Sequence, residues 1–257
     1  MPIGEASAAK VSQPGGEVLV VAALSEELDA ALRLCAGVTR IPARGIRAWE
    51  GRRRDRAISF LKTGVGPARA ESSLTLYLEQ RRPARILAFG YAGALREGFE
   101  IGDLVAVERA SLLRLEPTTP GGVSGAQLEG TWQLDAEPWR RGGRERVDAL
   151  TSPHIIGDPR DKGVLHGRFG ASIVDMETAG LARAAAAAAV PLACVRAITD
   201  LVDDDFLAPF GYVPESGPAL RVARVLAAGH WVRRYREWKV RAERARSTLC
   251  DFLGSYL

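Results

Sequence analysis

Residues 174–178, VDMET, are followed by an alanine-rich run and then by residues 196–200, RAITD. Each motif ends an apolar segment with a carboxylate, Glu177 in the first and Asp200 in the second. The alanines favour a helix, and Pro191 ends it before the second apolar segment begins. The order strand, helix, strand is typical of α/β proteins, which bind ligands at the carboxyl ends of their strands. Both acids are therefore expected where chemistry on a small molecule is possible.

The same alternation continues toward the N-terminus. We expect further strands at 17–24, 46–50, 56–62, 85–89 and 102–109. A helix is expected to begin with Ser25 as its N-cap, because Glu26 and Glu27 suit the positive end of a helix dipole. The glycine-rich turn TGVGP at 63–67 leads into a helix that ends near residue 80. This pattern predicts a largely parallel or mixed sheet flanked by helices.

Three segments depart from the alternation. Residues 1–16 are rich in Gly, Ser, Ala and Pro, and we expect a disordered lead-in before a domain at 17–257. Residues 115–150 show no clear period, which predicts a long loop or an insertion. A short strand is expected to resume at 151–156, and a long helix is expected at about 216–246.

The composition is that of a soluble globular protein, with 47% hydrophobic and 26% charged residues. The net charge is +4, but the cations are scattered and no nucleic-acid reader motif is present, so no nucleic-acid partner is expected. The densest basic stretch, at 51–56, lies between two expected strands and indicates a hairpin turn. Neither a signal peptide nor an apolar run of membrane-spanning length is visible, which predicts a cytoplasmic protein.

The cysteines argue against a disulfide framework and against a metal site. They are Cys35, Cys194 and Cys250, odd in number and far apart. Cys194 falls inside an apolar strand and is expected in the core. No metal is therefore predicted.

Four segments carry a resemblance to a known family. They are VVAALSEE at 20–27, KTGVG at 62–66, FGYAGA at 89–94 with GD at 102–103, and VDME at 174–177 with RAITD at 196–200. In this order the chain resembles the purine nucleoside phosphorylase / methylthioadenosine–S-adenosylhomocysteine nucleosidase superfamily over about 17–110 and 150–205. The resemblance implies a single α/β domain with a mixed, twisted, partly barrel-like sheet flanked by helices. It also implies an enzyme that cleaves the N-glycosidic bond of a purine nucleoside, with adenine as the expected base.

The resemblance assigns roles to the acids. Asp200 matches the acid that protonates purine N7, so that the base leaves as a neutral species. Glu177 matches the acid that binds the ribose hydroxyls and stabilises the oxocarbenium-like charge, and Met176 matches the residue packed on the sugar. Glu27 falls where the nucleosidases hold the base that activates water, with Glu26 as its rival. The competing interpretation of each acid is a helix or turn cap.

Two further sets of residues are expected around the substrate. The set predicted to hold an anion or a water is Gly64, Gly66, Gly90 and Tyr91. The set predicted to contact the base is Ala92, Gly93, Ile155 and Ile156. Glycines in such turns are equally well explained by turn geometry alone. His154 lies beside the second set, but a lone histidine on a loop is more often structural than catalytic.

The nucleophile is inferred from departures from the phosphorylases. Those enzymes hold phosphate with arginines and a serine, whereas Tyr91 stands at the serine position and Phe89 at one arginine position. Water is therefore expected, without a cofactor. Phosphate as co-substrate remains the alternative, through Arg44, Arg47 or the basic turn at 51–56, even across a subunit boundary. A non-catalytic nucleoside-binding or storage protein is the third interpretation, which the joint presence of three acids disfavours.

The expected partners follow from the same resemblance. The ligand is a small-molecule nucleoside, and family members are usually dimers, trimers or hexamers, so a homo-oligomer is expected. The C-terminal helix combines aromatic residues with many arginines and is first interpreted as docked on the domain. As a hypothesis, it lies against a membrane or shields a lipid-like substituent, as the hopanoid-associated nucleosidases of this superfamily would require.

Overall fold

The computed structural model describes residues 16–54, 56–115, 123–135, 144–205 and 231–257, with side chains of the last helix from residue 239 onward. The lead-in predicted at 1–16 lies outside the described residues except for Gly16. The first part of the helix predicted at 216–246, up to residue 230, also lies outside them.

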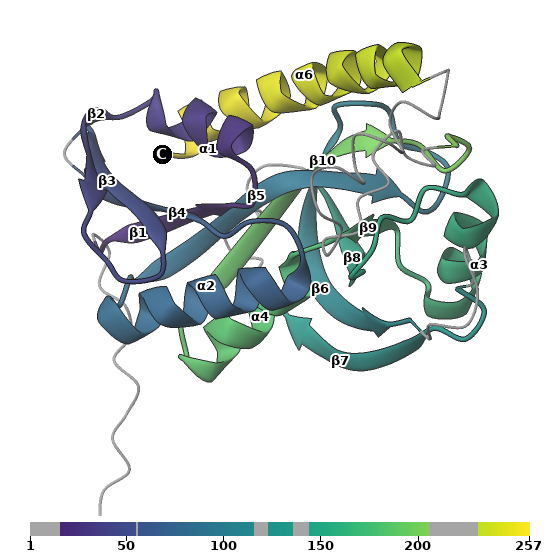
Figure 1. Ribbon diagram of the computed structural model, residues 1–257, viewed down its shortest axis with the longest axis horizontal. Coiled ribbons are helices and arrows are strands. Elements are labelled where there is room, and N and C mark those ends of the chain that lie inside the picture. Colours follow the sequence, from purple (N-terminus) through teal and green to yellow (C-terminus); the bar gives the residue numbers. More distant parts are fainter. Residues whose placement is uncertain (1–15, 55, 116–122, 136–143, 206–230) are drawn as a thin grey trace, which may run out of the picture.

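A single mixed sheet runs through the domain (Figure 1). Its strands are β1 Val18–Ala22, β2 Ala36–Ile41, β3 Arg47–Arg53, β4 Arg56–Lys62, β5 Arg85–Ala94, β6 Leu104–Arg114, β7 Gln127–Gln133, β8 Glu145–Thr151, β9 Ile173–Asp175 and β10 Leu192–Asp200. The strand order is β10-β6-β8-β9-β5-β1-β4-β3-β2, with β7 on β6, and β10 pairs with β5 as well. The strands β10, β6, β8, β9 and β5 therefore close into a ring, from which the others extend as an open sheet. The mixed, partly barrel-like sheet is confirmed.

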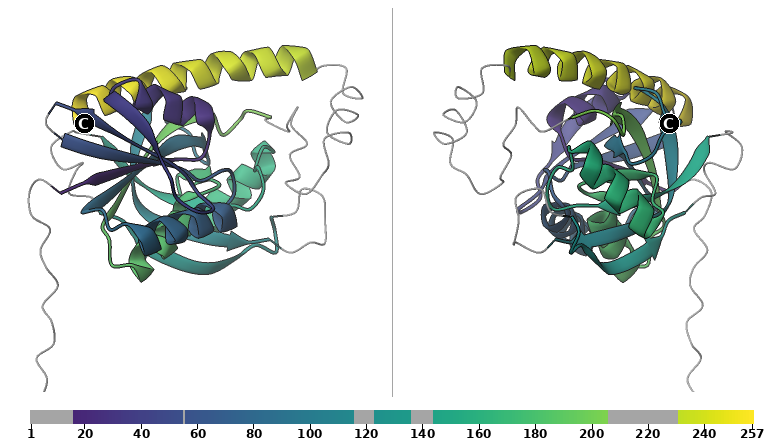
Figure 2. Two further views of the ribbon diagram at one scale, coloured as in Figure 1. Left: turned by 60° about the vertical axis from the view of Figure 1, so that its left-hand side comes forward. Right: turned by 90° about the vertical axis from the view of Figure 1, so that its right-hand side faces the viewer.

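Helices cover both faces of this sheet (Figures 1 and 2). Their bounds are α1 Ser25–Leu32, α2 Pro67–Gln80, α3 Pro159–Phe169, α4 Thr178–Ala187 and α6 Trp231–Tyr256. Helices α1 and α6 lie on one face, and α2 and α4 lie on the other. Side chains alternate along β1, so that Leu19 and Val21 join the core under α2 and α4, whereas Val20 and Ala22 join the core under α1.

The strand–helix–strand unit predicted around Pro191 is confirmed as β9, α4 and β10. Helix α4 packs closely on α2, because Gly180 lacks a side chain: a Cβ there would lie 2.2 Å from the carbonyl oxygen of Pro67. The basic stretch at 51–56 joins β3 and β4, which pair antiparallel, so the predicted hairpin is confirmed as well.

The expectation for 115–150 is wrong in part, because β7 lies within this range and β8 begins within it. β7 is exposed or half-buried throughout and has only two large apolar residues, Leu128 and Trp132, and β8 begins with charged residues. The strand expected at 151–156 ends at Thr151, just before Pro153, which has no backbone N–H to continue a ladder. Neither β2 nor α3 was predicted, and α6 continues to Tyr256, beyond the expected end at 246.

No helix among the described residues combines the length and the apolar character needed to cross a membrane. From Ala245 onward, the buried residues of α6 pack in the core that the sheet and α1 share. They are Ala245, Leu249, Phe252 and Leu253, and Leu257 joins them directly after the helix. The docked helix expected from the sequence is therefore present over this part.

Candidate active site

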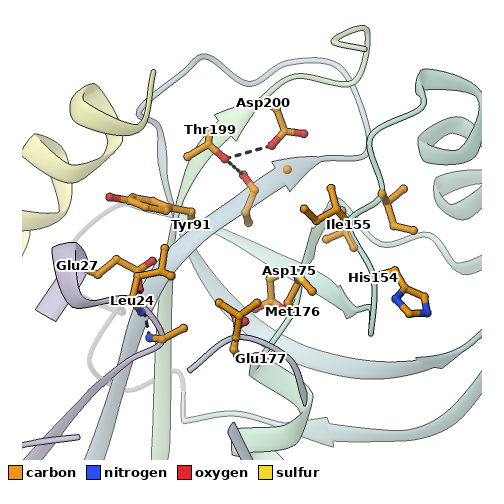
Figure 3. A pocket seen from close by; sticks show the side chains of 16 residues that line it. Leu24, Glu27, Tyr91, His154, Ile155, Asp175, Met176, Glu177, Thr199 and Asp200 are labelled. Atoms are coloured by element: carbon orange, nitrogen blue, oxygen red, sulfur yellow. Dashed lines mark hydrogen bonds between the residues drawn. The ribbon is translucent and has the colours of Figure 1, made fainter. Parts of the chain in front are cut away.

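A cavity of about 150 Å³ lies where β1, β5, β9 and β10 end (Figure 3). Glu27, Glu177 and Asp200 all line it, together with Tyr91 and Met176. The three carboxylates belong to residues only 3%, 7% and 5% exposed, respectively. The structure thus brings acids from three distant segments to one hollow, where burial disfavours the charged form of each.

Glu27 is held by the start of α1. Leu24, rather than the predicted Ser25, is the N-cap, and the Glu27 carboxylate folds back to accept the N–H groups of Leu24 and Ala23 at 2.9 and 3.2 Å. Burial raises the pKa of Glu27 to about 7, against the lowering effect of these amides and of Arg196. Glu26, the rival acid, is exposed and is not among the residues that line the cavity.

Arg196 is a buried cation, 2% exposed, next to an acid that lines the cavity. Its Nη2 lies 2.7 Å from Oδ2 of Asp175 and donates to Oγ1 of Thr178 over 2.7 Å. Gly90 stands beside it in the paired strand β5, and a Cβ there would lie 2.3 Å from Nη1 of Arg196 and 3.0 Å from Oε1 of Glu27. The absence of a side chain at Gly90 therefore makes room for the guanidinium beside an acid.

Glu177 is held by the turn before α2. Its Oε1 accepts the backbone N–H of Gly66 over 3.0 Å. Burial raises the pKa of Glu177 to about 8, and the cation of Arg196 opposes this effect. Asp175 precedes Glu177 by two residues at the end of β9. It too lines the cavity, but it accepts from Thr151 and forms the ion pair with Arg196, so its carboxylate is already occupied.

Asp200 ends β10 against a lysine that no sequence motif singled out. Lys162, on α3, is fully buried, and its Nζ donates to Oδ2 of Asp200 over 2.6 Å. Oγ1 of Thr199 lies 3.1 Å from the other oxygen, Oδ1. Burial raises the pKa of Asp200, and Lys162 is the main influence that lowers it. Gly93 makes room here, because a Cβ at Gly93 would lie 2.5 Å from Oδ2 of Asp200.

The predicted anion or water set is largely occupied by internal contacts. The N–H of Gly64 donates to the carbonyl oxygen of Ala23, and the N–H of Gly66 donates to Glu177. Gly90 packs against Arg196, and Tyr91 alone of this set lines the cavity. The N–H groups of Gly64 and Gly66 are therefore not free for a ligand, and the anion or water site stays a prediction.

The predicted base-binding set lies together. Ala92, Gly93, Ile155 and Ile156 all line the cavity, as does His154. Among the described residues, no group of three or more His, Cys, Asp or Glu side chains is arranged to hold a metal ion. The arrangement offers three buried acids: Asp200 is paired with a cation, Glu177 is held by a backbone amide, and Glu27 has a pKa of about 7. Such a set can donate a proton, bind hydroxyls and activate water.

The chain is similar in sequence to known proteins over most of its length. The sequence model of the phosphorylase superfamily matches residues 17–138 and 145–215. The 5′-methylthioadenosine/S-adenosylhomocysteine nucleosidase of Haemophilus ducreyi is 26% identical over 196 residues, which cover 72% of this chain and 84% of that protein. The enzyme of the same name from Listeria monocytogenes is 24% identical over 202 residues, covering 72% and 87%.

Solved structures share the fold. A mutant of the Helicobacter pylori MTAN, with 5′-methylthioadenosine in its active site, has a TM-score of 0.70 at 18% identity, covering 94% of this chain and 98% of that chain. A futalosine hydrolase mutant of Helicobacter pylori has a TM-score of 0.71 at 16% identity, covering 93% and 97%.

Proposed function

The chain belongs to the phosphorylase superfamily, and we propose that it hydrolyses the N-glycosidic bond of purine nucleosides, with adenine nucleosides as its first substrates. The observation that carries this proposal is the meeting of Glu27, Glu177 and Asp200 in one buried cavity. Relatives named for 5′-methylthioadenosine and S-adenosylhomocysteine support adenine as the base.

Asp200 supplies the proton for the departing base. Its raised pKa favours the carboxylic acid, which donates to purine N7 while the electron pair of the C1′–N9 bond passes to the base. The base then leaves as a neutral molecule. Ala92, Gly93 and the isoleucines line the wall on which a planar purine would pack.

The sugar left behind carries oxocarbenium-like positive charge. Glu177, fixed by Gly66, binds the ribose hydroxyls, and Met176 packs on the sugar. The carboxylate form of Glu177, which the cation of Arg196 favours against the effect of burial, stabilises the positive charge of the sugar. Glu27, with a pKa of about 7, is substantially ionised near neutral pH. It takes a proton from the water that attacks C1′, so the products are free base and free ribose, and no cofactor takes part.

Phosphorolysis is the second candidate. The two turn amides expected to hold an anion are bonded to Ala23 and Glu177, which leaves phosphate fewer donors and favours water. For phosphorolysis, Arg44, Arg47 or the basic turn at 51–56 would have to supply the cations that bind phosphate. We further propose that the protein acts in the cytoplasm, on a free nucleoside, as a homo-oligomer.

Product analysis tests the proposal. The protein is incubated with 5′-methylthioadenosine or adenosine, with and without phosphate, and the products are separated by mass spectrometry. Hydrolysis releases adenine and a free sugar, whether or not phosphate is present, and the oxygen of H₂¹⁸O appears on C1 of the sugar. A sugar 1-phosphate formed only with phosphate establishes phosphorolysis instead. No released base from a panel of purine nucleosides contradicts both.

A further inference from the structure

Helix α3 buries a lysine against the acid at the end of β10. Lys162 is 0% exposed, and Nζ contacts two acceptors: Oδ2 of Asp200 at 2.6 Å and the carbonyl oxygen of Leu201, also at 2.6 Å. Both acceptors lie at the end of the same strand. The ammonium is therefore fixed to the end of β10, at the edge of the cavity.

Burying an ammonium group requires compensation, since removing a charge from water carries a large free-energy penalty. Apolar side chains of similar volume would hold α3 against β10 equally well. Placing the cation on one oxygen of a cavity-lining carboxyl group has a chemical consequence that an apolar contact would lack. It leaves Oδ1, beside the Thr199 hydroxyl, as the oxygen that this pair does not occupy.

We propose that Lys162 is a positioning residue for Asp200: its ammonium orients the carboxyl group and neutralises the carboxylate that remains after the proton has been given to the substrate. This inference rests on the proposed function. As the C1′–N9 bond breaks, the proton moves from Asp200 to purine N7, and negative charge appears on Asp200, a residue that is only 5% exposed. The ammonium keeps its own protons throughout. Asp200 regains its proton from solvent after the base leaves.

The charges around Asp200 give the direction of the effect. Lys162 faces it from α3 and lowers its pKa, whereas Asp204, in the loop after β10, raises it. Asp204 itself is paired with Arg241 of α6. Without Lys162, Asp200 would hold its proton more tightly and would be a weaker acid. Activity would fall, and the alkaline limit of activity would move to higher pH.

The test compares Lys162→Met, which keeps the length of the aliphatic stem, with Arg160→Met, which removes an exposed cation two residues away on the same helix. For Lys162→Met we expect kcat at pH 7 to fall about 10- to 100-fold with KM changed less than about threefold. The alkaline limb of the kcat profile should rise by about one pH unit or more. Arg160→Met should leave both unchanged.

The results should differ if Lys162 only holds α3 against β10. If Lys162 acts through Asp200, adding Lys162→Met to Asp200→Asn lowers kcat no further, and Lys162→Arg restores the position of the alkaline limb. The inference is overturned if Lys162→Met leaves the limb in place, or if it lowers kcat by the same factor in both backgrounds. Thermal unfolding checks the fold, and Lys162→Gln, which is neutral but polar, should reproduce the shift if the Met variant does not fold.

A measurement without turnover separates this inference from the proposed function. ¹³C NMR of labelled aspartate carboxyl groups, assigned with Asp200→Asn, follows the protonation of Asp200 directly. Its midpoint should rise in Lys162→Met relative to the wild type. If the wild type releases no base but the midpoint rises, only the proposed function fails. If base is released and the midpoint is unchanged, only the role of Lys162 fails.

Discussion

The backbone N–H of Gly66 donates to Oε1 of Glu177 over 3.0 Å, so the start of α2 binds a carboxylate of the protein itself. A helix N-terminus favours negative charge, and a glycine-rich turn in front of it is a common anion site. Here that site is filled from within. The turn therefore serves to fix the acid that would hold the ribose, and it does so at the place where a phosphate would otherwise find donors.

Replacing Gly66 with alanine should loosen Glu177. Gly66 has φ 103°, which an L side chain rarely adopts, although no atom lies within 4 Å of an added Cβ. The strain, about 1–3 kcal/mol, should shift the turn and its N–H. We expect KM to rise several-fold. The control is Gly37→Ala, which carries the same kind of strain at φ 63° on β2, away from the cavity. It should lower the melting temperature without changing KM, and equal effects on KM would contradict the role given to Gly66.

Glu27→Gln should abolish most of the hydrolysis while leaving substrate binding intact. The amide oxygen of Gln can still accept the N–H of Leu24, so the local fold is kept, but it cannot take a proton from water. We expect kcat to fall about 10²- to 10⁴-fold. In the wild type, kcat/KM should rise as the pH passes through about 7, because Glu27 then loses its proton. Glu26→Gln, which changes the exposed neighbour, should leave both kcat and this rise of kcat/KM with pH unchanged.

The same acid should make the fold less stable at higher pH. Burial raises the pKa of Glu27 from 4.5 to about 7, so between these values the folded chain keeps a proton that the unfolded chain releases. The free energy of unfolding therefore falls as the pH rises through this window. At about 1.4 kcal/mol for each pH unit, the change is about 3 kcal/mol. Urea unfolding at pH 5 and pH 8 measures it. The difference should shrink by about that amount in Glu27→Gln but not in Glu26→Gln.

Local signals explain what the sequence predicted correctly. The unit formed by β9, α4 and β10 was recognisable because an alanine run and Pro191 mark its helix, and apolar runs mark its strands. The hairpin of β3 and β4 was recognisable from a charged turn between two apolar runs. Strands β2 and β7 were not. All but one residue of β2 and every residue of β7 are at least partly exposed, so neither strand contains the apolar run that marks a buried strand.

Some contacts in the site join segments that are far apart in the sequence, and these contacts could not be predicted from the sequence alone. Gly90 was interpreted as a turn residue, but it lies within β5, where its missing side chain accommodates Arg196 from the neighbouring strand. Lys162 meets Asp200 across 38 residues of sequence through a helix that was not predicted. For Arg196 the sequence did hold a signal. A charged residue inside an apolar strand indicates that the charge has a buried partner, which is Asp175.

Arg196→Met should show how much of the site depends on that buried cation. Its removal leaves Asp175 without its ion-pair partner in a place where both side chains are nearly inaccessible, 2% and 0% exposed. We expect a loss of about 3–5 kcal/mol in the free energy of unfolding, because an uncompensated buried charge remains. Arg109→Met, which removes the cation of an exposed pair with Asp148, should cost less than about 1 kcal/mol.

Adding Asp175→Asn to Arg196→Met should recover part of the stability, since the buried charge is then gone. Urea unfolding of the four proteins at one pH gives these values. Equal small losses for the two arginines would contradict the role given to Arg196.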